Sequence, residues 1–310
     1  MSAAPPASVS AAPAAPALAM SKRFDAKRIF DTPVEFFITG EKGRLAVLAR
    51  DGAATLPHRF EAGKWEALEL PAAHKAADAS TLGIYFGRDN RPRLMGYAGA
   101  PESARMVYLR YKDGAWQDQR SELGGVAADS AALFGVLGEA DPEVVCKVGM
   151  PTCLLKSRKG WKDVKSSLTP GAVIRAFEGK GYALTSDGVY RADDGGFTRV
   201  GPAAPWKTAA TGFWVGPGEK MAVVEPGANS LHVFNGDVWR SERAPIDGPR
   251  DVAGPAGDRW FAGQAGLAHV GADGPTRVGD ATWDLSRVIL ASGSAYAGGK
   301  SGVVVAASTP

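Results

Sequence analysis

Hydrophobic and polar residues alternate along short segments of this chain, which is the period of β-strands and not of helices. One stretch shows the pattern in full: alternating segments lie at about residues 172–177, 181–185, 188–191 and 197–200, with glycine-containing turns between them. Glycine adopts the positive φ angles that tight hairpin turns require. The same order recurs over residues 251–278. The pattern therefore predicts sheets of four short antiparallel strands.

A short signature repeats along the chain at intervals of about forty residues. Each copy is a strand, then a turn that contains Gly or Asp, then an aromatic residue. The copies end at Trp65, Trp116, Trp161, Phe197 and Trp239, and a decayed copy without the aromatic spans residues 269–276. A repeat of this length with four strands is what a β-propeller blade requires.

The two ends of the chain complete one repeat together. The last segment supplies only three strands, at about residues 285–290, 295–298 and 302–307, and an orphan strand at about residues 23–30 precedes the first blade. Placing all four in one blade closes the ring and removes exposed sheet edges. We therefore predict an all-β, seven-bladed β-propeller over residues 22–310, with four-stranded antiparallel blades and the N-terminal strand closing the last blade. Six blades is the alternative count.

Residues 1–21 are predicted to be a disordered leader, because Ala and Pro dominate them and such a composition cannot bury a core. They lack the basic start and the continuous apolar stretch of a signal peptide. Spacers of this kind often follow an export signal or a lipid-anchor cysteine, which slightly favours a periplasmic, envelope or secreted location. A cytoplasmic protein with a frayed tail is the alternative. No stretch reaches the ~18 apolar residues that a transmembrane helix needs.

Composition and charge exclude some partners. The formal net charge is +3, from 36 basic and 33 acidic residues, so the chain lacks the electrostatic footprint of a nucleic-acid-binding protein. The one small basic cluster consists of Lys22, Arg23, Lys27 and Arg28, and we interpret it as a solvated edge near the start of the domain.

One turn resembles the Asp-box of sialidase-like and BNR-type propellers and of the related photosystem-assembly-factor-like propellers. The family pattern is Ser-x-Asp-x-Gly-x-Thr-Trp. Asp194, Gly196 and Thr198 match it, whereas Ala192 and Arg199 depart from it. In that family the box is a structural turn far from the active site, so the resemblance implies the fold and no catalytic role. The arginine triad, the Tyr–Glu pair and the Asp acid/base of sialidases have no recognisable counterparts in this chain.

The aromatic residues that close the repeats allow two interpretations. Stacked on sugar rings, they would make a multivalent lectin. Their common position at the start of the outer strand favours packing against the neighbouring blade instead, where each would bury a large apolar area. Packing is therefore the favoured interpretation and sugar stacking the alternative.

Three histidines, His58, His232 and His269, hold equivalent positions in three copies of the repeat. A catalytic zinc often has three protein ligands. Equivalent positions in separate blades diverge from the ring axis, however, and cannot converge on one ion. The sequence therefore predicts hydrogen-bonded structural histidines and no metal site.

Cys146 and Cys153 flank a segment with Gly149 and Met150 at its midpoint. A hairpin that turns there places the two cysteines directly opposite each other, with Cβ atoms about 4.5–5.5 Å apart, close enough for a disulfide after modest adjustment. A disulfide implies an oxidising compartment. Two reduced, buried thiols are the alternative.

The motifs of P-loop nucleotide binding, nucleophile elbows, zinc metalloproteases and EF-hands are absent. The prediction is a non-enzymatic binding or scaffolding propeller that presents rim loops to a protein or glycan partner, as a monomer or as part of a larger assembly. No catalytic residue and no cofactor is assigned. A propeller lectin is the first alternative function, and a glycoside hydrolase of sialidase-like type is the second.

Overall fold

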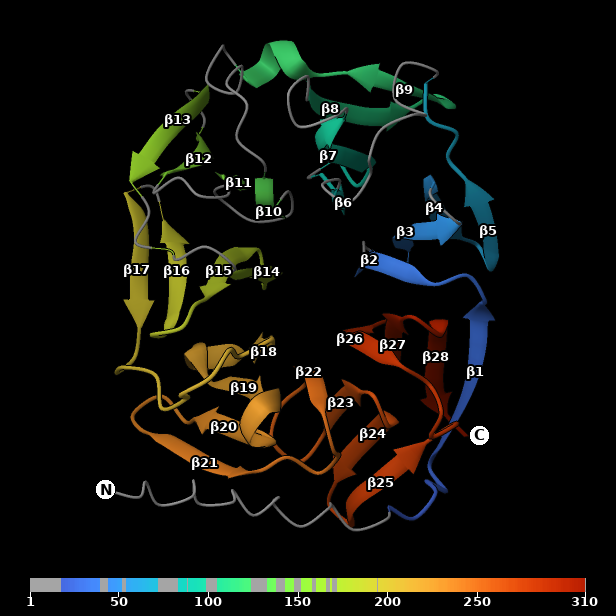
Figure 1. Cartoon of the computed structure of the whole chain (residues 1–310), viewed down its shortest axis with the longest axis vertical. Helices are drawn as coiled ribbons and strands as arrows, with labels where there is room; N and C mark the ends of the chain where they lie inside the picture. Colours follow the sequence, from blue (N-terminus) through green and yellow to red (C-terminus); the bar gives the residue numbers. More distant parts are fainter. Residues whose placement is uncertain are drawn as a thin grey trace, which may run out of the picture.

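The structure is a computed structural model that describes residues 18–39, 44–51, 54–71, 83–87, 89–98, 105–123, 133–137, 143–147, 152–157, 160–165, 168, 172–193 and 195–309. These residues form seven four-stranded antiparallel sheets arranged around a common centre (Figure 1). Seven is the larger of the two counts that the sequence allows. The predicted β-propeller with four-stranded antiparallel blades is confirmed.

We letter the blades A to G in chain order, and each runs from its innermost to its outermost strand. Blade A contains β2 (Val34–Thr39), β3 (Leu45–Asp51), β4 (Ala54–Glu61) and β5 (Lys64–Ala67). Blade B contains β6 (Gly83–Phe86), β7 (Pro92–Ala98), β8 (Arg105–Lys112) and β9 (Ala115–Asp118). Blade C contains β10 (Leu133–Leu137), β11 (Glu143–Lys147), β12 (Thr152–Ser157) and β13 (Gly160–Lys165). Blade D contains β14 (Val173–Phe177), β15 (Lys180–Leu184), β16 (Val189–Asp193) and β17 (Gly196–Val200).

Blade E contains β18 (Gly212–Val215), β19 (Met221–Glu225), β20 (Ser230–Phe234) and β21 (Trp239–Arg243). Blade F contains β22 (Pro249–Ala253), β23 (Arg259–Gly263), β24 (Gly266–Gly271) and β25 (Gly274–Val278). Blade G contains β26 (Leu285–Ala291), β27 (Ser294–Gly299), β28 (Gly302–Ser308) and, outermost, β1 (Phe24–Phe30). Among the described residues, three short 3₁₀ turns, η4 (Arg120–Leu123), η5 (Pro217–Glu219) and η6 (Pro226–Ala228), lie between strands.

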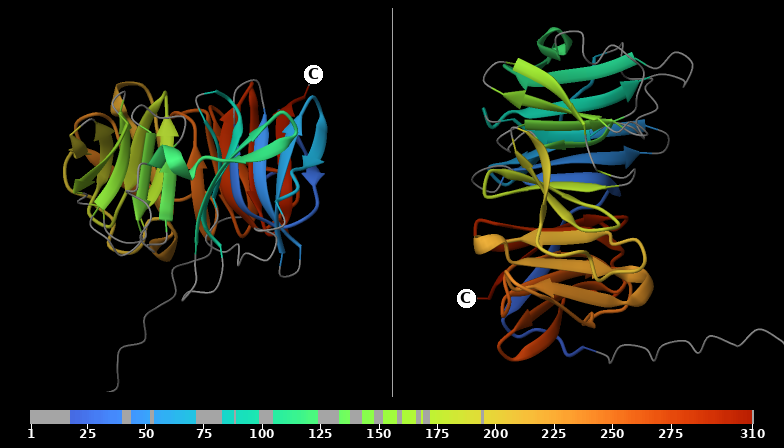
Figure 2. Two further views of the ribbon diagram at one scale, coloured as in Figure 1. Left: turned by 90° about the horizontal axis from the view of Figure 1, so that it is seen from above. Right: turned by 90° about the vertical axis from the view of Figure 1, so that its left-hand side faces the viewer.

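The ring closes through the two ends of the chain, as predicted. β1 pairs antiparallel with β28 from Phe24–Ser308 to Phe30–Val303, and the backbone N–H of Thr309 donates to the carbonyl of Arg23 at 2.9 Å. The innermost strands contact one another in the order β2, β6, β10, β14, β18, β22 and β26, and β26 contacts β2. Seen from the side, the strands of the blades run across the thickness of the ring (Figure 2).

Strand position within a blade decides how each strand is buried. The second strands β19 and β23 are buried at every residue, because both of their faces meet a neighbouring blade. The outermost strand β21 is exposed at four of its five positions. Continuous apolar segments therefore form the interior of the ring and mixed segments form its rim.

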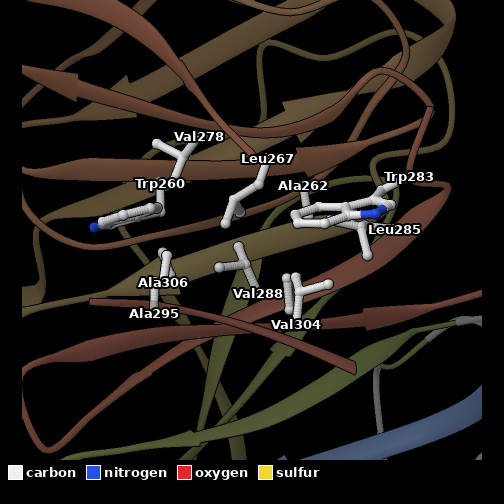
Figure 3. Close-up of a cluster of buried hydrophobic side chains, with 12 residues drawn as sticks. Trp260, Ala262, Leu267, Val278, Trp283, Leu285, Val288, Ala295, Val304 and Ala306 are labelled. Atoms are coloured by element: carbon white, nitrogen blue, oxygen red, sulfur yellow. The ribbon is translucent and has the colours of Figure 1, made fainter. Parts of the chain in front are cut away.

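Apolar side chains fill the junctions between blades. Figure 3 shows the junction of blades F and G, where Trp260, Leu267 and Val278 of blade F meet Val288 and Val304 of blade G. Trp260 is 3% exposed, and the other four side chains are fully buried. Burial of such side chains is worth about 1.5–3 kcal/mol each, so each blade depends on its neighbours for stability.

Candidate functional site

A cleft opens at the junction of blades A and B. Its volume is about 380 Å³, which lies within the range of ~300–1,000 Å³ typical of ligand sites. The β4–β5 hairpin of blade A forms one wall, and the β6–β7 and β8–β9 turns of blade B form the other. All three are turns at the rim, where propellers present variable side chains on a fixed scaffold.

Two arginines and two glutamates form the wall from blade A. Arg59 on β4 lies opposite Glu66 on β5, and its guanidinium donates to that carboxylate at 2.5 Å. Its other terminal nitrogen lies 3.4 Å from Glu61. Arg44, just before β3, completes the network with an ion pair to Glu61 at 2.6 Å. Both glutamates are therefore neutralised within their own blade.

The β8–β9 turn of blade B brings an aromatic ring to the cleft. The guanidinium carbon of Arg59 lies 5.5 Å from the centre of the Tyr111 ring, a cation–π contact across the junction. Asp113 and Gly114 form the tip of the turn with φ angles of 54° and 81°. Phe86 at the end of β6 is 1% exposed and gives the cleft an apolar base.

The β6–β7 turn supplies further charges, beside the Lys112–Asp113 pair of the β8–β9 turn. The carboxylate of Asp89 lies 3.6 Å from the guanidinium of Arg93 and 3.9 Å from that of Arg110. Neither of these two arginines lines the cleft. Its carboxylate also accepts the backbone N–H of Arg91 at 3.4 Å. Within the described part of the chain, the guanidinium of Arg91 has no ion-pair partner. Arg91 is therefore the lining cation that a ligand can engage without breaking an existing pair.

At the junction of blades D and E, an ion pair bridges the equivalent position. Arg59 and Arg191 are each the second residue of the recurring signature. Arg191 crosses to the next blade and pairs with Glu219 in η5, whereas Arg59 turns back to Glu61 and Glu66 of its own blade. Among the described residues, Arg59 forms no such ion pair with the β6–β7 turn of blade B and reaches that blade only through its cation–π contact with Tyr111. The cleft lies at this A/B junction.

The sequence did not identify the cleft, since its lining comes from turns in two different blades. One signal was nevertheless present. Arginine occupies the second place of the signature in the first, second and fourth copies, as Arg59, Arg110 and Arg191. This pattern could suggest an arginine that faces the next blade, but it could not show which carboxylate would pair with that arginine.

The aromatic residues that close the repeats pack between blades, in agreement with the favoured interpretation. The indole N–H of Trp65 donates to the carbonyl of Ile29 in blade G at 2.7 Å. Trp116, Phe197 and Trp239 each pack against a buried cluster at the junction with the preceding blade. The side chain of Trp161 lies outside the described residues.

The three histidines lie apart and each has a local partner, as the sequence predicts. His58 contacts the carbonyl of Leu56 at 3.1 Å through Nδ1. Nε2 of His269 lies 2.6 Å from Asp258. Among the described residues, no group of three or more His, Cys, Asp and Glu side chains is placed to hold a metal ion.

His232 belongs to the most developed of the buried polar networks. Its Nε2 lies 3.0 Å from Glu225 and its Nδ1 lies 2.8 Å from the hydroxyl of Ser241. Glu225 also accepts the backbone N–H groups of Lys207 and Thr208 and the hydroxyl of Thr208. Burial raises the pKa of Glu225, but the hydrogen bonds from Thr208, His232 and Lys207 outweigh burial and hold this pKa at about 2. The network ties the linker between blades D and E to blade E.

The turn that resembles an Asp-box is held by Asp193. Its carboxylate accepts the backbone N–H of Gly195 and the hydroxyl of Thr198, both at 2.8 Å. Asp194, the aspartate that matches the family pattern, lies outside the described residues. The turn therefore has a local structural role. The aspartate that forms its hydrogen bonds, Asp193, is not the one that aligns with the Asp-box pattern, Asp194.

Cys146 and Cys153 lie directly opposite each other in the register of β11 and β12, which is the pairing that the predicted disulfide requires. Cys153 is 1% exposed. In the described part of the chain, no helix is long and apolar enough to cross a membrane.

Comparisons with known proteins show the fold. No protein-family profile and no curated protein matches the chain. Among solved structures, virginiamycin B lyase from Staphylococcus aureus superposes with a TM-score of 0.67 at 11% identity, covering 92% of this chain and 99% of that one. YCF48 bound to D1 peptide gives a TM-score of 0.63 at 13% identity, covering 95% and 100%. The extracellular domain of BT4673 from B. thetaiotaomicron gives 0.61 at 11% identity, covering 92% of this chain and 40% of that one.

These neighbours are β-propellers, and they differ in what they do. Their names include an enzyme, a peptide complex and an extracellular domain. At such identities the likeness shows the fold alone, since one propeller scaffold hosts unrelated functions. The function of this chain must therefore be argued from its own site.

Proposed function

We propose that this chain is a non-enzymatic binding propeller that holds a protein partner at the cleft between blades A and B. The observation that carries the proposal is the open A/B junction, where Arg59 turns back to its own blade and Arg91 has no ion-pair partner among the described residues. The structure of the propeller YCF48 bound to D1 peptide is a precedent that supports the proposal.

The chemistry of the cleft suits recognition better than catalysis. Arginine and tyrosine are among the residues enriched at protein interfaces and at their binding hot spots, and the cleft presents both in Arg91 and Tyr111. Glu61, Glu66 and Asp89 are each already paired with arginine. A general base must be within hydrogen-bond reach of a substrate proton, and carboxylates that are held by arginine are poor proton acceptors.

A propeller lectin is the alternative. Tyr111 beside the carboxylates of the cleft gives an aromatic face with polar groups at its edge, and this arrangement also suits a sugar ring. The lectin would bind glycans at this cleft, whereas the protein-binding propeller would bind peptides there. A glycoside hydrolase would additionally cleave the glycan.

Two parallel screens of the whole chain distinguish these functions. One is selection from a displayed library of random peptides, and the other is a glycan array. The proposal expects peptides that bind the whole chain and are lost on Arg91→Ala. If the chain instead binds glycans on the array and Arg91→Ala abolishes that binding, the lectin would replace the peptide-binding propeller as the function. Binders that tolerate Arg91→Ala would contradict the cleft as the site.

We further propose that Cys146 and Cys153 form a disulfide and that the protein works in an oxidising, extracytoplasmic compartment. The register of β11 and β12 supports the disulfide, and the extracellular domain of BT4673 shares the fold. Intact mass before and after reduction tests the bond: a gain of about 2 Da on reduction supports it, and an unchanged mass contradicts it.

A further inference from the structure

The segment that precedes β1 forms backbone hydrogen bonds to the outer edge of blade F. Met20 bridges to Arg277 of β25 in parallel orientation. The backbone N–H of Ser21 donates to the carbonyl of Arg277 at 2.7 Å, and the N–H of Arg277 donates to the carbonyl of Ala19 at 2.8 Å. Residues 19–21 thus act as a short fifth strand of blade F, beside β25 (Figure 1).

The edge of β25 is open at one place and blocked at another. Arg277 pairs with Ala268 and Pro275 with Val270 of β24. Residues two apart on a strand present their backbone groups to the same side, so positions 275 and 277 both face outward. Pro275 has no N–H and cannot accept an added strand, which is a common protection of sheet edges. The outward N–H and carbonyl of Arg277 are available to an added strand, and residues 19–21 form hydrogen bonds with them.

The added segment is held lightly. Besides the two hydrogen bonds to Arg277, Leu18 packs against the buried cluster at the E/F junction, which includes Val224, Leu231 and Phe261. Met20 is 57% exposed and contributes little burial. The hydroxyl of Ser21 accepts the backbone N–H groups of Arg23 and Phe24, both at 3.2 Å. This turn separates residues 18–21 from β1, so they can leave β25 without unpairing β1 from β28.

We propose that the outer edge of β25 at Arg277 is a strand-addition site, kept occupied in this chain by its own residues 18–21. Its other occupant is an extended, uncharged segment of a partner protein that runs parallel to β25 and places an aliphatic side chain where Leu18 lies. The main-chain hydrogen bonds of Arg277 supply the affinity and the E/F cluster selects the aliphatic side chain, as in other cases of strand addition. The site lies in blade F, apart from the A/B cleft.

Amide hydrogen exchange on the full chain tests whether residues 18–21 can leave. Leu18→Asp removes the packing and should make the Arg277 amide exchange at least tenfold faster. The amides of Thr276 and Val278 face β24 and should keep their wild-type rates. Met20→Asp places the same charge on an exposed side chain and serves as the matched control with wild-type exchange. Faster exchange at all three amides would show that residues 18–21 are an integral part of blade F. An unchanged exchange rate at the Arg277 amide would show that Leu18 does not hold the segment on β25. Either result overturns the proposal.

A peptide in trans tests whether the edge accepts a strand. The probe is a synthetic peptide of residues 12–21, added to the Leu18→Asp chain. Saturable restoration of protection at Arg277 is expected, with none from the same peptide carrying Asp in place of Leu. In a Leu18→Asp, Arg277→Pro chain the outward donor is gone and the peptide should bind at least tenfold more weakly. No effect of the peptide, or equal binding to the proline variant, would overturn the proposal.

Discussion

Arg175 on β14 donates to Asp251 on β22 at 2.6 Å, although blade E stands between the two blades. The same guanidinium donates to the carbonyl of Phe213 in blade E at 2.9 Å. The second carboxylate oxygen of Asp251 accepts the backbone N–H of Val288 in blade G at 2.8 Å. The buried ion pair of Arg175 and Asp251 therefore joins four successive blades, D to G, at the inner edge of the ring.

Asp251→Asn should destabilise the protein by about 3–5 kcal/mol, because it leaves the guanidinium of Arg175 buried without its counter-charge. Urea unfolding followed by tryptophan fluorescence measures the change as a shift of the midpoint. Asp247→Asn is the matched control: Asp247 is 51% exposed and pairs with Arg243 at 3.3 Å, so its loss should cost about 0.5 kcal/mol. Equal effects of the two substitutions would show that Asp251 does not join the blades.

Glu225 should make stability depend on acid pH. Its folded pKa of about 2 lies below the ordinary value of 4.5, so its contribution is fully present above pH 4.5 and is lost as the pH falls toward 2. The size is on the order of 3 kcal/mol. Glu225→Gln should weaken the protein at pH 7 and flatten the loss of stability between pH 5 and pH 2. A variant whose stability falls as steeply as that of the wild type would contradict this role.

Trp65 should contribute mainly through packing between blades G and A. Trp65→Ala removes the ring that contacts Phe30 and Phe60 and is expected to cost about 3–5 kcal/mol. Trp65→Phe keeps an aromatic ring at this position but loses the hydrogen bond to Ile29 and part of the indole packing, so it should cost about 1–2 kcal/mol. Chemical unfolding of the two variants separates these contributions. If Trp65→Ala were neutral and glycan binding were lost, the sugar-stacking interpretation would replace packing.

The fold could be predicted from the sequence because its signals are local. Alternation and glycine turns placed the strands of blade D within one or two residues, as in the predicted 172–177 and the observed β14 (Val173–Phe177). The opposition of Cys146 and Cys153 followed from one hairpin. Closure by β1 followed from counting three strands in the last repeat.

The A/B cleft and the buried Arg175–Asp251 ion pair could not be predicted in the same way, because they depend on contacts between blades. Arg175 and Asp251 are 76 residues apart, and no period in the sequence relates them. At the cleft Arg59 forms ion pairs within its own blade, whereas the equivalent Arg191 pairs with the next blade. That choice is set by the carboxylates that the fold brings near each arginine, which the repeat pattern does not reveal.

The most direct test of the account is the affinity of a library-selected peptide for cleft variants of the whole chain, measured by fluorescence anisotropy. Arg91→Ala and Tyr111→Ala should each weaken binding at least tenfold, about 1.4 kcal/mol or more, as expected of interface hot spots. Arg240→Ala, which removes an exposed arginine on β21, should leave the affinity unchanged. Peptides that bind the cleft variants as tightly as the wild type would contradict the claim that this propeller holds its partner between blades A and B.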